Sequence, residues 1–388
     1  MRVRFLIPCV LAAAAAAGDW KLSFVADANI PTGTPFEAVG RAGAAERAAM
    51  PQGVLARKVS GGFGGISALA FDRKSGTLYA LSDSAAPVLF ALKFALRGGA
   101  VQLSPVAAIP LKNADGGLVA EWTLDPEGLA LLPRGTLLLS SEGYPVRSVD
   151  PALVEFDSQG RTLRRLPVPP KFLPASSEGT RSGVRHNLGF EGLTLAPDGK
   201  RFYTVTEGPL EQDGPGCSTS QACTSRILEY TLEGGEARPA REFAYPIEAM
   251  PLPAALPNAK GHAGASELLA LSGNELLVLE RGFAFDEETK GMHQTIRIYH
   301  ATLEGASDVS GMASLAQAGS WRPVAKRLLL DLESVVPQFS QGYRKLDNFE
   351  GMCLGPRLKD GSRTLILVSD NNYGDNQRTA FVVLRLTQ

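Results

Sequence analysis

Short apolar runs alternate with turns along most of the chain, in an order that repeats. Each repeat consists of an apolar run of about five residues, a turn that contains glycine, a second apolar run and then an acidic residue. The repeats occupy residues 64–84, 125–143, 189–208, 265–282 and 348–372. Runs of this length, rich in β-branched and aromatic residues and bounded by turns, predict five β-hairpins.

Two further strand-like runs lie in each gap between the hairpins. Four antiparallel strands repeated in this way predict an all-β fold, a β-propeller of four-stranded antiparallel blades. Only one more run, residues 379–388, follows the last hairpin, and the N-terminal run at 21–31 could supply the missing outer strand and close the ring. Five blades are therefore predicted. A sixth, degenerate blade within 19–62 and a pair of ordinary sandwiches stay open as alternatives, although the long regular period disfavours the sandwiches.

Composition agrees with a folded chain that has many tight turns. Apolar residues make up 44% of the 388 residues and charged residues 20%, which allows a sizeable core. The net charge of −1 gives no basic excess for nucleic acid or an anionic membrane, and we expect neither as a partner. No linker-like stretch divides residues 19–388, so we expect one domain and a monomer. Insertions at about 208–225, 248–264 and 304–325 should decorate its faces.

The N-terminus has the pattern of a signal peptide over residues 1–17. A basic start, "MRVR", precedes the apolar stretch "FLIPCVLAAAAAA", and small residues at 15–17 offer a cleavage site. The stretch is shorter than the roughly 20 apolar residues that a membrane-spanning helix needs. An N-terminal anchor stays open as the alternative. We expect export to the periplasm or the outside, with no membrane span after cleavage.

The cysteines fit an oxidising compartment. In the short polar stretch "CSTSQAC", Cys217 and Cys223 are expected to form a disulfide that holds a loop. Cys353 lies in the apolar run "GMCLGP" and is expected to be a buried small hydrophobe.

Acidic residues recur at both open ends of the predicted hairpins. The first strands begin with Ser67, Glu127, Glu191, Glu267 and Glu350, and the second strands end with Asp83, Glu142, Glu207, Glu280 and Asp370. A hairpin brings these two positions to the same end, so nine carboxylates should gather around one mouth of the central channel. Strand alternation suggests that only a subset points inward. The glycine after Glu127, Glu191 and Glu350 is expected to be a packing requirement near the axis.

Crowded carboxylates repel one another unless they are protonated, ion-paired or bound to a cation. Oxygen ligands without a Cys/His cluster favour a hard cation, Ca²⁺ before Mg²⁺. The alternative for any single acid is a solvated side chain or one that accepts a backbone N–H. The expected metal ligands are Asp83, Glu127, Glu142, Glu191, Glu207, Glu267, Glu280, Glu350 and Asp370.

Other candidate groups lie near the acids in the sequence. His186 precedes Glu191 by five residues in a polar loop, and it is either a loop histidine bonded to backbone or a proton donor. Arg181, Arg185 and Arg281 could hold an anionic group, or could be surface arginines with solvated ends. There is no G-x-S-x-G elbow and no Walker loop. The catalytic candidates are His186, Arg281 and Glu191.

Three segments resemble a known family: "RSGVRHNLGFEGLTLAPDGKRFYTVTEGPLEQDG", "SELLALSGNELLVLERGF" and "DNFEGMCLGPRLKDGSRTLILVSDNNYGDNQRTAFVVLRL". They are similar to the phytase-like domain family, labelled "esterase-like activity of phytase". The resemblance implies a secreted bacterial propeller related in fold to phosphate-ester hydrolases that use Ca²⁺.

Two classes of function follow as hypotheses. The first is a hydrolase of a small anionic ester, with a metal at Glu191, Glu350 and Asp370, Arg281 as a second positive contact and His186 as proton donor. The second is a non-catalytic exported propeller whose ion is structural and whose face binds a partner or a polymer. A lactonase-like hydrolase on a metal-centred propeller is a smaller possibility.

Overall fold

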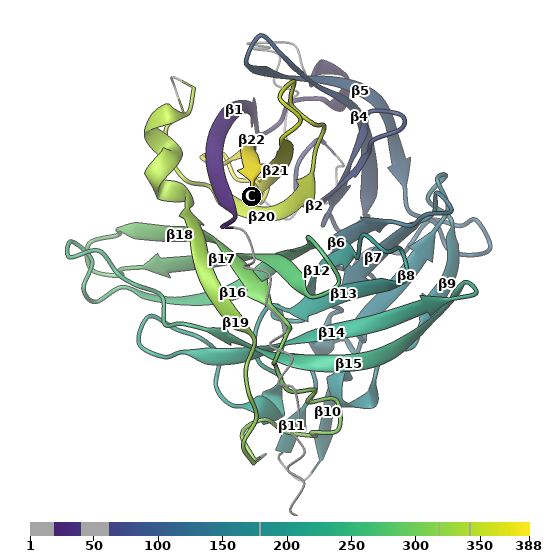
Figure 1. Ribbon diagram of the computed structural model, residues 1–388, viewed down its shortest axis with the longest axis vertical. Coiled ribbons are helices and arrows are strands. Elements are labelled where there is room, and N and C mark those ends of the chain that lie inside the picture. Colours follow the sequence, from purple (N-terminus) through teal and green to yellow (C-terminus); the bar gives the residue numbers. More distant parts are fainter. Residues whose placement is uncertain (1–18, 40–61, 178–179, 318, 341–342) are drawn as a thin grey trace, which may run out of the picture.

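A computed structural model describes residues 19–39, 62–177, 180–317, 319–340 and 343–388, and their strands form five four-stranded antiparallel sheets arranged around a common centre (Figure 1). The predicted β-propeller is confirmed. The first blade consists of β2 (Ile66–Asp72), β3 (Thr77–Ser82), β4 (Val88–Arg97) and β5 (Ala100–Pro110). The second consists of β6 (Pro126–Leu131), β7 (Leu137–Ser141), β8 (Ala152–Phe156) and β9 (Thr162–Leu166).

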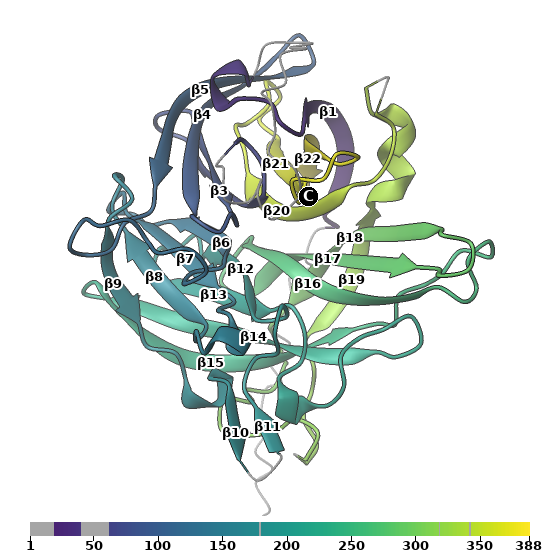
Figure 2. The ribbon, with the colours of Figure 1, turned by 180° about the vertical axis from the view of Figure 1, so that it is seen from behind.

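The next two blades repeat the same order of strands from the centre outward. The third consists of β12 (Phe190–Leu195), β13 (Arg201–Thr206), β14 (Cys223–Glu233) and β15 (Glu236–Ile247). The fourth consists of β16 (Lys260–Ala270), β17 (Glu275–Phe285), β18 (Met292–Thr302) and β19 (Ala325–Asp331). A two-stranded hairpin of β10 (Ala175–Ser177) and β11 (Thr180–Ser182) lies at the outer edge, below β14 and β15 in both views (Figure 2).

The fifth blade joins the two ends of the described chain. Its strands are β20 (Asn348–Leu354), β21 (Arg363–Asp370), β22 (Arg378–Thr387) and, as the outer strand, β1 (Lys21–Pro31). The antiparallel pairing of β1 with β22 confirms that the N-terminal run closes the ring. The described part of the possible sixth blade forms only β1 and a 3₁₀ turn, and residues 40–61 lie outside the described ranges.

Short 3₁₀ helices occupy some of the connections. They are η1 (Phe36–Ala38), η2 (Pro145–Arg147), η3 (Pro170–Phe172), η4 (Glu211–Asp213) and η5 (Leu332–Gln338). None of the helices in the described ranges is both long and apolar enough to cross a membrane.

The core lies between the blades. Strands β2, β6, β12, β16 and β20 contact one another in this order around the axis, and β20 contacts β2 to complete the circle. Five apolar clusters fill the spaces between successive sheets, so both faces of each inner hairpin are buried. Outer strands such as β5 alternate exposed and covered residues instead. This packing explains why the inner hairpins have continuous apolar runs.

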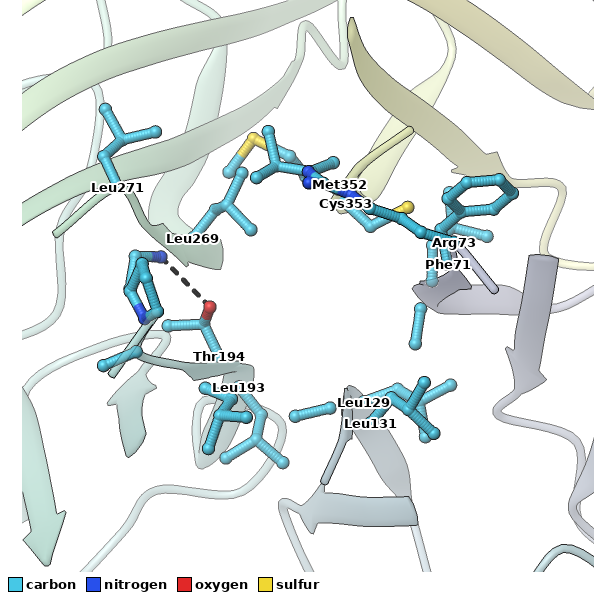
Figure 3. Close-up of a pocket in the computed structure, with 18 of the residues that line it drawn as sticks. Phe71, Arg73, Leu129, Leu131, Leu193, Thr194, Leu269, Leu271, Met352 and Cys353 are labelled. Atoms are coloured by element: carbon cyan, nitrogen blue, oxygen red, sulfur yellow. Dashed lines mark hydrogen bonds between the residues drawn. The ribbon is translucent and has the colours of Figure 1, made fainter. Parts of the chain in front are cut away.

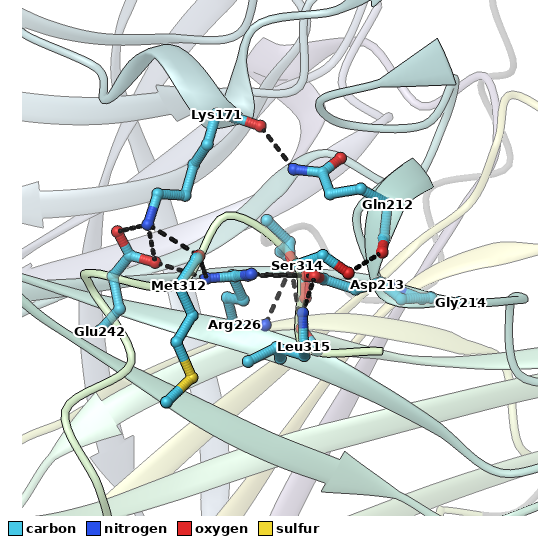
Figure 4. Close-up of polar contacts among 12 residues, drawn as sticks. Lys171, Gln212, Asp213, Gly214, Arg226, Glu242, Met312, Ser314 and Leu315 are labelled. Carbon is cyan, nitrogen blue, oxygen red and sulfur yellow. Dashed lines mark hydrogen bonds and ion pairs between the residues drawn. The ribbon is translucent and has the colours of Figure 1, made fainter. Parts of the chain in front are cut away.

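Two features hold the peripheral loops. The expected Cys217–Cys223 disulfide is present, and Cys353 is buried with a free thiol. A buried ion network fixes part of the predicted insertion at 304–325 (Figure 4). Arg226, on β14, donates to Asp213 over 2.6 and 2.8 Å, to Glu242 over 2.8 Å and to the Met312 carbonyl over 3.2 Å.

Candidate functional site

Each inner strand is irregular near its start. The pairing with the second strand shifts register there, and the residues at the shifts are Ser67, Glu127, Glu191 with Gly192, Ser266, and Glu350. Bulges of this kind bend a strand and redirect a side chain. The bulges therefore set the direction of the acids that begin three of the inner strands.

In the fourth blade, the residues at the bulge are offset by one from the positions expected when the five hairpins of the sequence are matched. Ser266 lies at its bulge, so Glu267 takes the place that glycine has in the other acid-bearing blades. On the second strand, Ala265 pairs with Glu280, which puts Arg281 where other blades have Asp83 or Glu142. A shift of one residue sends a strand's side chains to the opposite face. Contrary to the sequence prediction, Glu267 and Glu280 therefore do not occupy the positions of the other acids; Ser266 and Arg281 occupy them instead.

Seven carboxylates gather at the open ends of the hairpins, and we call them the acid cluster. Ligand atoms of Asp125, Glu127 and Glu142 lie within 4.8 Å of one another, as do those of Glu142, Glu191 and Glu207. The charges of Asp83 and Glu350 also act on Glu127. The acid cluster consists of Asp83, Asp125, Glu127, Glu142, Glu191, Glu207 and Glu350.

Asp125 was missed by the sequence analysis. It stands two residues before Glu127, a spacing that places two side chains on the same side of a strand and could have identified it. Its Oδ1 accepts a hydrogen bond from the Tyr144 hydroxyl over 2.7 Å, which holds the carboxylate at the edge of the acid cluster.

The acids disfavour one another's ionised forms. Burial, followed by the charges of neighbouring acids, raises the pKa values of Glu127, Glu142 and Glu191 well above their ordinary range. Burial also raises the pKa of Glu350 to about 7, although Arg281 acts in the opposite direction. Ionising the acids of the acid cluster together is thus unfavourable, and a bound cation would stabilise their ionised forms.

Arg281 supplies a positive charge beside the acid cluster. Its Nη2 contacts Glu207 Oε1 at 2.8 Å, and its Nη1 contacts Glu350 Oε1 at 2.7 Å and Asn348 Oδ1 at 2.6 Å. Burial opposes the charged form, but Glu350, Glu207 and Glu191 outweigh it and raise the pKa of Arg281. One guanidinium therefore balances only the Glu207–Glu350 side of the acid cluster.

The remaining predicted ligands have other partners. Glu267 Oε1 accepts the N–H groups of Leu193 and Leu268, both at 2.9 Å, and so links two inner strands. Glu280 Oε1 accepts from the Tyr245 hydroxyl over 2.7 Å and is ion-paired with Lys326. Asp370, buried at the end of β21, accepts the Asn372 N–H over 2.8 Å.

The polar residues of the loop before β12 lie farther out. His186 and Arg181 are exposed. Arg185 is ion-paired with Glu211 at 2.7 Å and donates to three backbone carbonyls, those of Pro209, Glu211 and Gly214. Arg185 is therefore committed to holding its own loop.

His262 is a second residue that the sequence analysis missed. It is exposed on β16, on the same side of the strand as Gly264, where an added Cβ would lie 2.2 Å from Glu207 Cγ. Partial desolvation lowers the pKa of His262, Glu207 acts against this shift and Arg281 reinforces it. An imidazole thus stands beside the acid cluster, closer in the fold than its sequence position suggests.

The expected role of the glycines is confirmed. A Cβ on Gly128 would lie 2.5 Å from the Glu191 carbonyl oxygen, and one on Gly351 would lie 2.7 Å from that of Ser67. On Gly192 it would lie 2.5 Å from the Leu268 nitrogen. Glycine lets neighbouring inner strands approach closely enough to bring their acids together.

The donor set suits a hard divalent cation. All groups that converge in the acid cluster are carboxylates, which Ca²⁺ and Mg²⁺ prefer over the nitrogen and sulfur ligands that zinc favours. Ca²⁺ takes six to eight oxygens in flexible geometry, which fits several acids from different blades.

Comparisons with known proteins identify distant relatives. An uncharacterised secreted protein of Arthroderma benhamiae is 25% identical over 202 residues, which cover 46% of this chain and 38% of that protein. The chain therefore spans well under half the length of this curated relative.

Two solved structures match this chain at low TM-scores. The periplasmic gluconolactonase of Pseudomonas aeruginosa matches 83% of this chain and 88% of its own, at 14% identity and a TM-score of 0.32. A putative glycosidase from Bacteroides thetaiotaomicron matches 82% and 86%, at 11% identity and a TM-score of 0.39. Similarities this distant carry no argument about activity.

The family comparison is much more extensive. A family model described as phytase-like, "esterase-like activity of phytase", matches residues 61–373. The matched segment contains all five inner strands and the whole acid cluster. The resemblance in the hairpin motifs is thereby confirmed, and this protein belongs to the phytase-like family.

Proposed function

We propose that the protein is an exported Ca²⁺-dependent hydrolase of phosphate or related esters that acts at the acid cluster. The observation that carries the proposal is the convergence of seven buried or half-buried carboxylates, of which Glu207 and Glu350 are ion-paired with Arg281. Family membership supports a hydrolase of this general kind.

The residues divide the site into two sides. Asp125, Glu127, Glu142 and Glu191 would hold the cation, because Glu142 brings them together: it shares one close group of three acids with Asp125 and Glu127 and the other with Glu191. When bound, Ca²⁺ supplies positive charge for the ester oxygens and acidifies a water at neutral pH. Glu207 and Glu350, already paired with Arg281, would complete the wall of the site.

Arg281 and the histidines supply the remaining chemistry. Arg281 is fixed by three contacts, so it presents its guanidinium in one orientation to an anionic group entering between the blades. His262 is exposed beside Glu207 and Arg281 and can exchange a proton with a leaving group, and exposed His186 is the alternative donor.

Export is part of the proposal. The Cys217–Cys223 disulfide fits an oxidising compartment, and the Arthroderma benhamiae relative is named as a secreted protein. The predicted signal peptide, residues 1–17, lies outside the described residues.

The test compares two variants on a panel of phosphomonoesters, phosphodiesters, phytate, lactones and carboxylic esters, with Ca²⁺ and with chelator. Glu191→Gln should abolish turnover by weakening the cation site, and excess Ca²⁺ should restore part of it. Arg281→Gln should bind Ca²⁺ at least as tightly as the parent, because it frees Glu207 and Glu350, but should raise KM. Folded, Ca²⁺-loaded protein that hydrolyses no member of the panel would instead favour a non-catalytic propeller with a structural ion.

A further inference from the structure

The end of the central channel opposite the acid cluster is a pocket with both apolar and polar groups in its lining. It has a volume of about 540 Å³ and is lined by the ends of the inner strands, where each turns into the second strand. Figure 3 shows leucines from three blades, Leu129, Leu193 and Leu269, around its hollow centre with Met352. Pockets of this size and character accommodate small organic ligands.

The wall of the pocket is pinned in place. Thr194 Oγ1, on β12, accepts the backbone N–H of Ala270 on β16 over 3.0 Å, the contact dashed in Figure 3. This bond joins two adjacent inner strands at the pocket and gives the Thr194 hydroxyl oxygen a hydrogen-bond partner. The hollow is therefore preformed, which lowers the cost of binding a ligand.

Three arginines stand together on one side of the rim. Arg73 follows β2, Arg357 follows β20 and Arg363 begins β21, and all three line the pocket. None of them is ion-paired with a carboxylate within the described part of the chain; Arg357 donates to the Gly361 carbonyl over 2.6 Å and Arg363 lies 4.6 Å from the Trp20 ring centre.

The three arginine side chains repel one another. Burial, followed by the charges of Arg357 and Arg73, lowers the pKa of Arg363 below its ordinary value. Glu275 acts in the opposite direction, but its carboxylate already contacts His300 Nε2 at 3.2 Å and Ser272 Oγ at 3.3 Å. Like charges brought together at the mouth of a hollow lined by leucines are complementary to an anion with an apolar body.

We propose that this pocket binds an amphiphilic carboxylate, a small molecule with one anionic head and an unbranched apolar tail. The tail would lie among the leucines, and the carboxylate would be held by Arg73, Arg357 and Arg363 at the rim. Guanidinium groups bind carboxylates through paired N–H donors, which suits a head group at this position. The site is independent of the acid cluster, which lies at the other end of the inner strands.

The probes are decanoate, decanol and decyltrimethylammonium, each below its micellar concentration and measured by titration calorimetry on the full chain. Decanoate should bind at one saturable site, at least tenfold more tightly than decanol, and the cationic amphiphile should not bind. The exposed pair Arg73→Gln/Arg357→Gln should weaken decanoate at least tenfold and leave decanol unchanged. Chelation of Ca²⁺ should have no effect on either affinity.

A second variant protects the test against a folding defect. Leu131 lines the pocket and is half-buried, so Leu131→Glu should fold and should exclude decanoate by placing a carboxylate in the hollow. Circular dichroism confirms the fold of each variant. Absence of saturable decanoate binding to the parent, equal binding of decanoate and decanol, or decanoate binding unchanged in both the arginine pair and Leu131→Glu would each overturn the proposal.

Discussion

Replacing Glu142 by Gln distinguishes a cation site from a purely structural network, because the change in Tm that it causes should differ with and without Ca²⁺. Glu142 belongs to both groups of three acids in the acid cluster. Its Oε1 accepts the Gly189 N–H over 2.8 Å, and the amide oxygen of Gln can accept the same bond. The substitution therefore removes a charge and preserves the shape and the hydrogen bond.

Without metal, the effect of Glu142→Gln on the free energy of unfolding follows from the raised pKa of Glu142. Burial and then Asp125 and Glu207 raise the pKa of Glu142 well above 4.5. A carboxyl with a raised pKa contributes stability at low pH and loses it as the pH rises through its ordinary pKa towards its folded value. At pH 7, above the ordinary pKa of a glutamate, part of the free energy of unfolding is therefore lost. Glu142→Gln should recover much of it and raise Tm in chelator.

With Ca²⁺ the advantage of Glu142→Gln over the parent should shrink. A cation at a hundredfold excess over its Kd stabilises the native state by about 2.7 kcal/mol. If loss of the shared ligand raises Kd a hundredfold, the same relation leaves only about 0.4 kcal/mol. The measurement is thermal unfolding at pH 7 across a Ca²⁺ titration. The shift in Tm produced by Ca²⁺ should be large for the parent and small for Glu142→Gln.

Glu280→Gln is the matched control. Glu280 is also a buried acid on a second strand, but its partners are Lys326 and Tyr245. Its substitution should change Tm by the same amount with and without Ca²⁺. If Glu142→Gln lowers Tm equally in both conditions, the acid cluster is not a cation site and the proposed function loses its basis.

Two further predictions concern the framework. Arg226→Met should lower the free energy of unfolding by about 3 to 5 kcal/mol, because it leaves Asp213 buried without a cation, whereas Arg241→Met at a half-exposed pair should cost less than about 1 kcal/mol. Urea unfolding checks both, and equal costs would show that burial does not decide the strength of these pairs. Gly192→Ala should destabilise by about 1 to 3 kcal/mol and reduce the Ca²⁺-induced shift in Tm, because its Cβ would force two inner strands apart; Gly216→Ala, with open space around it, should do neither.

The sequence alone determined the architecture, because strand length and turn chemistry are local properties. The repeated hairpins predicted five blades, and the run at 21–31 predicted the outer strand β1 that pairs with β22. The disulfide between Cys217 and Cys223 could also be predicted, since only five polar or small loop residues separate the two cysteines. These features depend on residues close in the chain or on a period that the whole chain repeats.

Only the tertiary structure decided which side chains meet. The matched hairpins placed Glu267 and Glu280 with the other acids. The bulge at Ser266 instead puts Arg281 where other blades have Asp83 or Glu142, and Glu267 accepts backbone N–H groups. Register and bulges arise from contacts between strands, which a sequence pattern with a period of two specifies only to within one residue. The roles of Asp125 and His262 depend on the same contacts. The arginines at the far rim were also beyond prediction, because Arg73 and Arg357 come together only when the last blade closes against the first.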